Sequence, residues 1–486
     1  MKRGSITVYL CLVLCVIVAL IFAALNSARY SCARAMISLA AEEGLFSLFG
    51  EYDRILYKDY GLLLIDGGYE SGSLKAGALM EETASVMEKV MNPGFSALLS
   101  SPSGLFRTDI DKKAITGYVL ATDSGGEAIR RQIHDLMLQK LGTDAAQSLY
   151  ERYLGAADQA ENAENESSEE RMERLKQEYE ARKEEAKEKQ AEEEENEAEP
   201  VQVPDDFVNP IETVYRLKRL GIMVFAIPDP SRISGGSVNK SALASARSFQ
   251  KGMGILPEYE ASASDRFLLS KYITDFFPCF LDETDGVFKY QAEYALVGYS
   301  RDVDNLRSVM NRLLLLRETM NYVHIYLDEE KQAETMAMAA VIASILLIPE
   351  AVELVQSILM LCWAFAESMV DIKTLLSGGK VPLIKNKSEW HLALSDLADL
   401  SVDTSAQGNQ NGFDYREYLI IFLMMRNDRN LMKSIMDLLE YNRRIKGESP
   451  AFSIDTCISS MEIQIGGCIG SKPYTLTRSF GYDSGI

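Results

Sequence analysis

Three side chains of this 486-residue sequence could bind a transition metal or carry protons near neutral pH, the histidines His134, His324 and His391. They lie far apart, and the sequence contains neither an H-E-x-x-H motif nor a Cys-x-x-Cys pair. Zinc sites usually show such a local spacing. His324 follows Met320 by one helical turn, so we interpret it as a hydrogen-bonded core histidine. We therefore predict neither a metal site nor a bound cofactor.

Three short motifs resemble catalytic or binding loops but lack residues that those loops need. Residues 298–301 (Gly-Tyr-Ser-Arg) begin like a nucleophile elbow, but Asp302 stands where a glycine is required. Residues 377–381 (Ser-Gly-Gly-Lys-Val) lack the first glycine and the final hydroxyl of a phosphate loop, which favours a helix-ending turn. Residues 282–286 carry carboxylates and a glycine, as calcium loops do, but do not fit the EF-hand pattern, which favours a solvated turn. We expect no catalytic residue and no enzymatic activity.

The seven cysteines are too few and too scattered to form a disulfide framework. Cys457 and Cys468 flank a predicted strand and could pair in an oxidising compartment. Buried free thiols are the alternative, and we favour them.

The helices that would position these residues follow from the spacing of apolar side chains. Apolar residues recur every three or four positions over 303–327, and a second helical pattern covers 350–376. On the second helix, Trp363 and Glu367 lie one turn apart, which we interpret as a packed aromatic ring beside a polar edge. Residues 336–348 are apolar but too few to span a bilayer, which favours a buried core helix over a second membrane pass. Further helices are predicted over 127–154 and, from a capping box formed by Asp414 and Glu417, over 414–444.

Short strands are predicted between and after these helices. Residues 60–66 are typical of a buried strand, and 113–122 and 221–227 are further predicted strands. Residues 287–299 also predict a strand, in a mixed rather than strictly alternating pattern. The C-terminal region alternates between apolar and polar residues, which predicts two half-buried strands. The apolar positions of these two strands are Met461, Ile463 and Ile465, then Tyr474, Leu476, Phe480 and Tyr482.

The net charge of −21 argues against nucleic acid as a partner, because phosphate binding needs a basic face. It also argues against a protein that lies flat on anionic lipid. About half of this excess is local, since residues 156–200 contain 18 acidic and 7 basic residues. With few apolar side chains to bury, this stretch cannot form a core, and we predict an exposed helical or disordered insertion. A coiled-coil partner site is the alternative.

An apolar run, Ile6–Leu25, follows a Met-Lys-Arg-Gly leader and contains no charged residue. A helix of about 20 residues at ~1.5 Å per residue matches the ~30 Å hydrocarbon core of a membrane. No clean cleavage site of the small-x-small type follows, so we favour a retained membrane-spanning helix over a signal peptide. The apolar stripe continues to Tyr60. We predict a break near Gly44 and Gly50, because each glycine costs a helix about 1 kcal/mol relative to alanine.

The leader and the apolar helix together resemble a class of prepilins in which a membrane peptidase cuts after the glycine, here between Gly4 and Ser5. Within that class the N-terminus is most similar to the tight-adherence (Tad) pseudopilins of the TadE/TadG type. The chain as a whole resembles a large uncharacterised domain family that accompanies Tad-like pilus genes in Gram-positive bacteria. The segments that carry this second resemblance are 41–44, 51–54, 60–63, 293–298, 363–371, 379–383 and 436–439.

The resemblance implies an N-terminus inside the cell and a bulk of the chain outside the membrane. It also implies a prepilin peptidase, other pilin or pseudopilin subunits and the pilus assembly machinery as partners. Pilins that enter filaments usually carry a glutamate five residues after the cut, where this sequence has Tyr9. Because an unpaired ammonium group is costly to bury, a tip, priming or anchoring role is implied rather than that of a major subunit.

We therefore expect an α+β protein in which an N-terminal transmembrane helix continues into a helix-rich extracytoplasmic head with short β-sheets. Its expected function is that of a membrane-anchored, outward-facing, pseudopilin-like structural or assembly component of a Tad-type pilus or related envelope machine. A membrane-tethered adhesin or binding module is the alternative, and a tethered hydrolase is the least favoured. Membrane lipid is a further expected partner. The expected parts are a leader (1–4), a transmembrane helix (5–28), a pilin-like part of the head (29–155), the acidic insertion (156–200) and a helix-rich C-terminal part that ends in strands (201–486).

Overall fold

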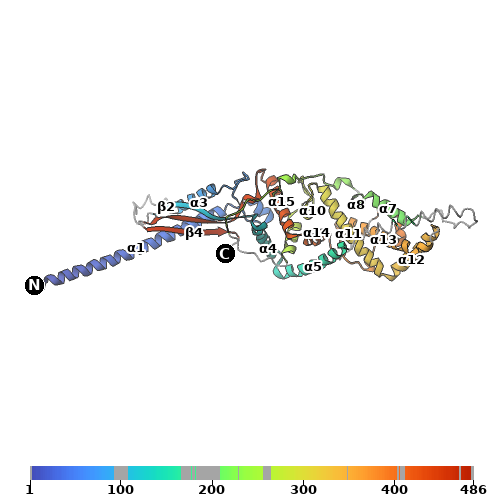
Figure 1. Ribbon diagram of the computed structural model, residues 1–486, viewed down its shortest axis with the longest axis horizontal. Helices are drawn as coiled ribbons and strands as arrows, with labels where there is room; N and C mark the ends of the chain where they lie inside the picture. The colour runs from blue at the N-terminus through green and yellow to red at the C-terminus, as the bar shows by residue number, and fades with distance from the viewer. Residues whose placement is uncertain are drawn as a thin grey trace, which may run out of the picture. The chain divides into compact units, whose positions relative to one another are not determined.

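The computed structural model is mostly helical, with one small antiparallel sheet (Figure 1). The first of its two compact units consists of residues 1–136, 241–261 and 436–486, and the second consists of 137–240 and 262–435. Each unit is assembled from stretches that are separated in the sequence, whereas the expected parts are consecutive. The described residues are 3–91, 108–165, 177, 181, 208–227, 229–254, 264–346, 349–401, 404, 411–469 and 472–482.

Helix α1 (Arg3–Phe49) of the first unit runs without interruption for 47 residues. Its side chains are exposed throughout Ile6–Leu25, and burial at every turn begins only at Ala33. Figure 1 shows this first half of the helix projecting beyond the sheet of the same unit. One helix therefore has an exposed apolar half and a half that packs in a protein core.

The helix break predicted near Gly44 is wrong, because this glycine serves a close helix crossing. A β-carbon on Gly44 would lie 2.9 Å from the Met87 side chain and 3.0 Å from the Thr83 carbonyl oxygen, both in α3 (Ala76–Met91). The missing side chain lets α1 and α3 approach each other while α1 continues. The break predicted near Gly50 is confirmed, because the helix ends at Phe49 and the Gly50 amide donates a hydrogen bond back to its last turn.

The sheet of the first unit is built on β3 (Cys457–Ile469), which pairs antiparallel with three other strands. The predicted C-terminal strands and the predicted strand at 113–122 are confirmed. The strand predicted over 60–66 is wrong for most of its length, because α2 (Arg54–Tyr60) occupies its start and ends at Gly61 with a left-handed φ of 69°. The partner strands are β1 (Ile65–Asp66), β2 (Thr108–Leu120) and β4 (Lys472–Gly481).

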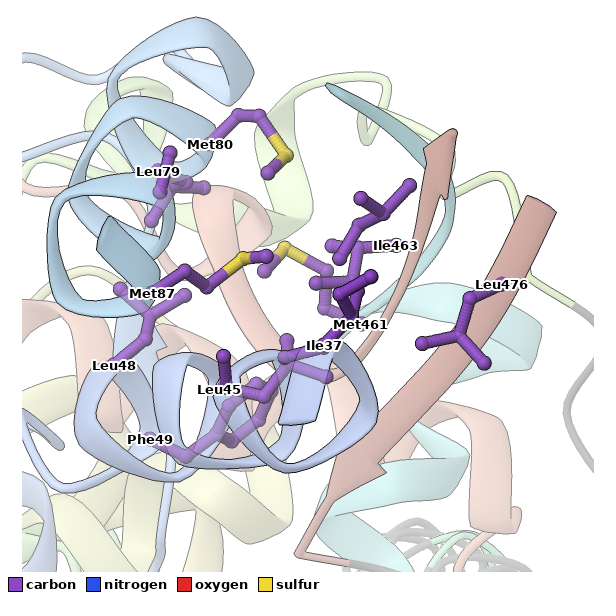
Figure 2. Packing of buried hydrophobic residues seen from close by; sticks show 14 of the residues in the cluster. Ile37, Leu45, Leu48, Phe49, Leu79, Met80, Met87, Met461, Ile463 and Leu476 are labelled. Atoms are coloured by element: carbon purple, nitrogen blue, oxygen red, sulfur yellow. The ribbon is translucent and has the colours of Figure 1, made fainter. Parts of the chain in front are cut away.

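Helices α1 and α3 pack on the apolar face of this sheet and form the core of the first unit (Figure 2). The predicted alternation of β3 is confirmed, since Met461, Ile463 and Ile465 are buried while Gln464 between them is exposed. Figure 2 shows Met461 and Ile463 facing the helices. The helix side chains that meet them include Ile37, Leu45, Leu48, Phe49, Leu79, Met80 and Met87.

Both C-terminal cysteines lie on β3 itself and remain free thiols. Cys457 and Cys468 occupy the two ends of this extended strand, so at ~3.3 Å per residue their Cα atoms are about 36 Å apart. A disulfide needs Cα atoms within about 7 Å. The alternative that these two residues pair within one chain is therefore wrong.

The helical prediction for 127–154 is confirmed, with one interruption. Helix α4 (Glu127–Leu141) ends at Gly142, whose φ of 81° no other residue type adopts as readily, and α5 (Thr143–Asn165) follows at once. The beginning of the predicted insertion at 156–200 is thus part of α5. Almost all of the insertion beyond Asn165 lies outside the described residues.

The second unit is a helical assembly around α13 (Val352–Leu376), and 94% of the most apolar stretch of α13 is buried. The predicted helices over 303–327 and 350–376 are confirmed. Helices that pack against α13 are α7 (Pro210–Leu220), α8 (Ile222–Ala226), α11 (Asp302–Leu327) and α12 (Glu329–Ile345). The remaining helices are α9 (Asp265–Phe276), α10 (Gln291–Val297), α14 (Tyr415–Met424) and α15 (Asp428–Lys446), the last of which continues into the first unit.

Two predicted strands of the second unit are helices. Residues 221–227 form α8, and residues 287–299 contain α10. The run at 221–227 is short and apolar, and such a run shows no periodicity that separates a buried strand from a buried helix. In α10 six consecutive residues are buried, so its helical period is hidden in the sequence.

Two other helix predictions hold to different degrees. The capping box of Asp414 and Glu417 at the start of α14 is confirmed, with each side chain accepting a hydrogen bond from the other residue's backbone amide. The buried core helix predicted over 336–348 is confirmed on one side only, as part of α12. There Ile342 is buried, but Met336 and Val341 are 40% and 53% exposed.

Replacing Gly44 tests the close approach of α1 and α3. We expect Gly44→Val to lower the free energy of unfolding by roughly 1–3 kcal/mol, because the new side chain must push the two helices apart. The matched control is Gly77→Ala at the start of α3, where a β-carbon would meet no atom within 4 Å. This control should be neutral or stabilising by up to about 1 kcal/mol. Urea denaturation of the detergent-solubilised protein, followed by circular dichroism, measures both changes, and an equal response of the two variants would contradict the crossing.

Candidate functional site

Two helices are long and apolar enough to cross a membrane, and their surroundings separate them. Helix α13 passes this test by composition, but it is the core helix of the second unit and almost completely buried. The apolar stretch of α1 has no buried residue at all. An exposed apolar surface of this size is rare on a monomeric soluble protein and marks a membrane or protein contact.

The predicted processing residues lie at the start of this exposed helix. Gly4 and Ser5 belong to the first turns of α1, and Tyr9 follows one turn later with a side chain that is 69% exposed. Along Ile6–Leu25 the sequence offers no carboxylate, so Tyr9 has no acidic neighbour on this part of the helix.

A cluster of four ionisable side chains lies in the core of the second unit, and we call it the charge cluster. It consists of Arg317 from α11, Glu367 and Asp371 from α13, and Lys385 from the segment after α13. All four side chains have an exposed fraction of zero. The four-residue spacing places both carboxylates on one side of α13. Charged side chains are almost never buried so completely unless they are paired.

The charge cluster is neutral, because two cations meet two anions. The Lys385 ammonium group contacts Oε1 of Glu367 and lies 2.6 Å from Oδ1 of Asp371. Nε of Arg317 donates to Oδ2 of Asp371 at 3.0 Å. Taking charges out of water costs several kcal/mol per ion, and close pairing offsets that cost.

Asp371 is the most closely surrounded member of the charge cluster. Besides Arg317, Nδ2 of Asn321 donates to its Oδ2 at 3.0 Å. Burial raises the pKa of Asp371, but the charges of Lys385 and Arg317 outweigh this effect and hold the pKa below its ordinary value. Arg317 also donates to the Pro382 carbonyl at 2.8 Å, which ties the segment after α13 to α11.

Glu367 is held by the backbone of the same segment. The amides of His391 and Leu392 donate to its two carboxylate oxygens, each at 3.0 Å. Nδ1 of His391 lies 3.0 Å from Oε1 of Glu367. The carboxylate therefore has a fixed orientation toward the Lys385 ammonium group.

Three of these residues have the donor types of a metal site. Glu367, Asp371 and His391 each offer one ligand atom, and these atoms lie within 4.8 Å of one another. The ammonium group of Lys385 contacts both carboxylates and so supplies the positive charge that a metal ion would bring. The two carboxylates of the charge cluster are therefore arranged to bind the Lys385 ammonium group.

Both tryptophans of the chain pack beside the charge cluster. Nζ of Lys331 lies 4.0 Å from the ring centre of Trp363 and 4.1 Å from that of Trp390, which are cation–π distances. The ring of His324 stacks on Trp390 with centres 5.1 Å apart. Burial lowers the pKa of His324, and the nearby Lys331 charge adds to this effect. In the described part of the chain, Nε2 of His324 has no hydrogen-bond partner, so the prediction of a core histidine held by a hydrogen bond is wrong and aromatic stacking holds it instead.

The other motifs singled out in the sequence have structural roles. Gly379 donates from its amide to the Thr374 carbonyl at 2.9 Å, which confirms the predicted helix-ending turn. Asp302 accepts hydrogen bonds from the amides of Lys289 (3.0 Å) and Tyr290 (3.1 Å) and thereby fixes the chain before α10. Asp282 forms an ion pair with Arg416, while Glu283, Asp285 and Gly286 of the predicted solvated turn are exposed. His134 lies in the first unit, where its Nδ1 is 3.1 Å from the neighbouring Asp135.

Sequence reasoning missed the charge cluster because its members are contributed by three separate segments. In the sequence, Glu367 resembles a residue at the polar edge of its helix. Arg317 lies within an apolar stripe, where a long charged side chain is easily taken for a surface residue. A signal was present, since Glu367 and Asp371 interrupt the most apolar helix of the second unit on the same side. Ionised residues at positions that must be buried predict partners of opposite charge elsewhere in the sequence.

A second buried carboxyl of the second unit is less completely paired. Oε1 of Glu293 accepts hydrogen bonds from the Phe280 amide and the Tyr415 hydroxyl, both at 2.8 Å. Its Oε2 has no hydrogen-bond partner among the described residues. Burial raises the pKa of Glu293 from 4.5 to about 7, although the hydrogen bonds from Phe280 and Tyr415 oppose this rise.

Comparison with known proteins yields one match. A family model described as a family of unknown function (DUF5702) matches residues 194–469, which is more than half of the chain. None of the curated proteins and none of the solved structures matches. The matched region contains all four residues of the charge cluster and does not include α1.

The buried carboxyl of Glu293 gives the stability a specific pH dependence. Between about pH 4.5 and pH 7 the folded state holds a proton that the unfolded state has released, so stability falls as the pH rises through this window. The difference between the two pKa values corresponds to about 3 kcal/mol. We expect Glu293→Gln to remove most of this fall. Urea denaturation at the two ends of the window measures it, and an unchanged difference in the variant would contradict a proton on Glu293.

Proposed function

This chain belongs to the family of unknown function DUF5702, and we propose that it is a membrane-anchored, outward-facing structural or assembly component of a Tad-type pilus or a related envelope machine. In this proposal the apolar half of α1 spans the membrane, and the rest of the first unit and the whole second unit lie outside it. The protein resembles a pseudopilin in its leader and its first helix. It acts by binding other subunits rather than by catalysis.

The observation that carries the proposal is the division of α1 into two halves of opposite environment. The apolar residues of Ile6–Leu25 are exposed on every side of the helix, whereas Ala33, Ile37 and Leu45 are buried in the core of the first unit. A helix that is apolar all round is stable only inside a core or in lipid. A lipid environment therefore explains the exposed apolar surface of the first half. The second half continues the same helix and packs on the sheet, so it fixes the folded part to the membrane.

The surroundings of the leader support processing by a prepilin peptidase. Gly4 and Ser5 lie at the membrane-entry end of α1, where a membrane-bound peptidase reaches its substrates. With Tyr9 in place of the usual glutamate, the new amino terminus of a processed neighbour would find no carboxylate here. Because an unpaired ammonium group is costly to bury, this favours a tip, priming or anchoring role over that of a major filament subunit.

The proposal predicts a mature protein that begins at Ser5. Mass spectrometry of the N-terminal peptide, from protein extracted with detergent from the native membrane, should show loss of the first four residues. Gly4→Leu should block the cut and leave the intact leader, while Lys2→Arg serves as the control that keeps both the charge and the cut. An intact Met1 in the native protein, or a cut near residue 28, would count against this function.

A further inference from the structure

The charge cluster brings an amine, an acid and a proton acceptor together away from water. Nζ of Lys385 lies 2.6 Å from Oδ1 of Asp371 and also contacts Oε1 of Glu367, and the three side chains have an exposed fraction of zero. Although the ammonium group is so close, Oδ1 of Asp371 has no partner with hydrogen-bond geometry in the described structure. The nitrogen is therefore held directly against the carboxyl group, at the distance of a close ion pair.

We propose that Lys385 and Asp371 form an intramolecular amide cross-link, with Glu367 as the group that moves the protons. The reaction converts a buried ammonium and a buried carboxylate into an amide and one water molecule. It needs no oxidant and no added reactant, since the charges cancel and the atoms balance. The proposal concerns the second unit alone and is independent of the function proposed for α1.

Each bond change has a group in place to assist it. Glu367 takes a proton from the Lys385 ammonium group and passes it to Oδ1 of Asp371, and the nitrogen lone pair that is set free attacks Cγ of the carboxyl group, which is now neutral. The negative charge then gathers on Oδ2, toward which Nε of Arg317 and Nδ2 of Asn321 both point from 3.0 Å. Donors aimed at a developing oxyanion are a strong source of catalysis.

The leaving oxygen departs as water. Oδ1 of Asp371 receives two of the three ammonium protons, both delivered by way of Glu367, and the bond between Cγ and Oδ1 breaks. The third proton stays on the new amide nitrogen. The reacting groups are held in contact, so they do not have to meet by collision in solution. Such an arrangement can raise the rate to that expected at an effective molarity of about 10⁵–10⁸ M.

The cluster remains balanced after the reaction. One positive and one negative charge disappear together, and Arg317 and Glu367 remain as a cation and an anion. Glu367 keeps the hydrogen bonds from the amides of His391 and Leu392, so it does not depend on Lys385 for support. Removing two buried charges as a neutral amide also relieves the desolvation cost of the original pair.

The choice of Asp371 over Glu367 as the acid rests on the donors around each. Asp371 Oδ2 faces the two side-chain donors that would stabilise an oxyanion, whereas Glu367 is oriented by backbone amides and lies beside the amine. The product would join α13 covalently to the segment that follows it.

Mass spectrometry of the wild-type protein tests the cross-link directly. Full-length protein extracted with detergent is denatured and digested with trypsin. We expect a branched peptide that joins the Asp371 and Lys385 peptides and is lighter than their sum by one water molecule. Cleavage after Lys385 should be lost. Linear peptides of full mass, with cleavage after Lys385, would overturn the proposal and leave an ion pair. Because this measurement uses wild-type protein, it does not depend on whether any variant folds.

Variants then assign the roles. Lys385→Arg keeps the charge but offers no reactive amine, and Asp371→Ala removes the acid, so each should return only linear peptides. Glu367→Gln keeps the shape but cannot accept a proton, and the cross-linked fraction should fall at least tenfold. Lys331→Arg, which changes a lysine beside the same tryptophans, is the control that should remain cross-linked. A full yield in Glu367→Gln, or a branch at Glu367 instead of Asp371, would overturn the assignment of roles.

Discussion

Pairing of charges away from water is the constraint on which both units depend. In the second unit the central helix α13 is buried on all sides, and its two carboxylates are compatible with that position only because Arg317 and Lys385 reach them. The first unit also contains charge pairs of this kind. Arg247 pairs with Glu440, and its Nη2 lies 2.8 Å from Oδ1 of Asp455. The contacts of Arg317 and Arg247 join segments that are distant in the sequence, so they also decide which segments pack together. Breaking such a pair leaves an uncompensated charge and costs about 3–5 kcal/mol.

Periodicity predicted the long helices and the alternating strands because one face of each is buried and the other is not. Helix α11 and strand β3 are the clearest examples. The same reasoning failed for α8, which has only five residues, and for α10, which is buried on nearly every side, so no pattern distinguishes them from strands. It also failed at Gly44, where the penalty that glycine imposes on an isolated helix is outweighed by the packing of α3 against it.

The candidate sites differ in how much a sequence can say about them. The apolar half of α1 is visible at once, because its chemistry lies in consecutive residues and does not depend on folding. The charge cluster is not visible, since its four members come from three segments and only the fold brings them within contact distance. The clue that remains in the sequence is the pair Glu367 and Asp371, which interrupts an apolar helix with a spacing of one turn. Such a pair indicates that cations must come from elsewhere, but not which ones.

The unbroken course of α1 has a mechanical consequence. A straight helix of 47 residues is about 70 Å long, and its second half is bonded to the sheet through Arg478 of β4, whose Nε donates to Glu42 at 2.8 Å. Because no hinge separates the two halves, the helix moves as one rigid rod. A tilt of the first half, or a pull on it, is therefore transmitted to β4 and is not absorbed by a flexible joint. The sheet would therefore report the orientation of the helix, and any force on the N-terminal half would load the strands along their length.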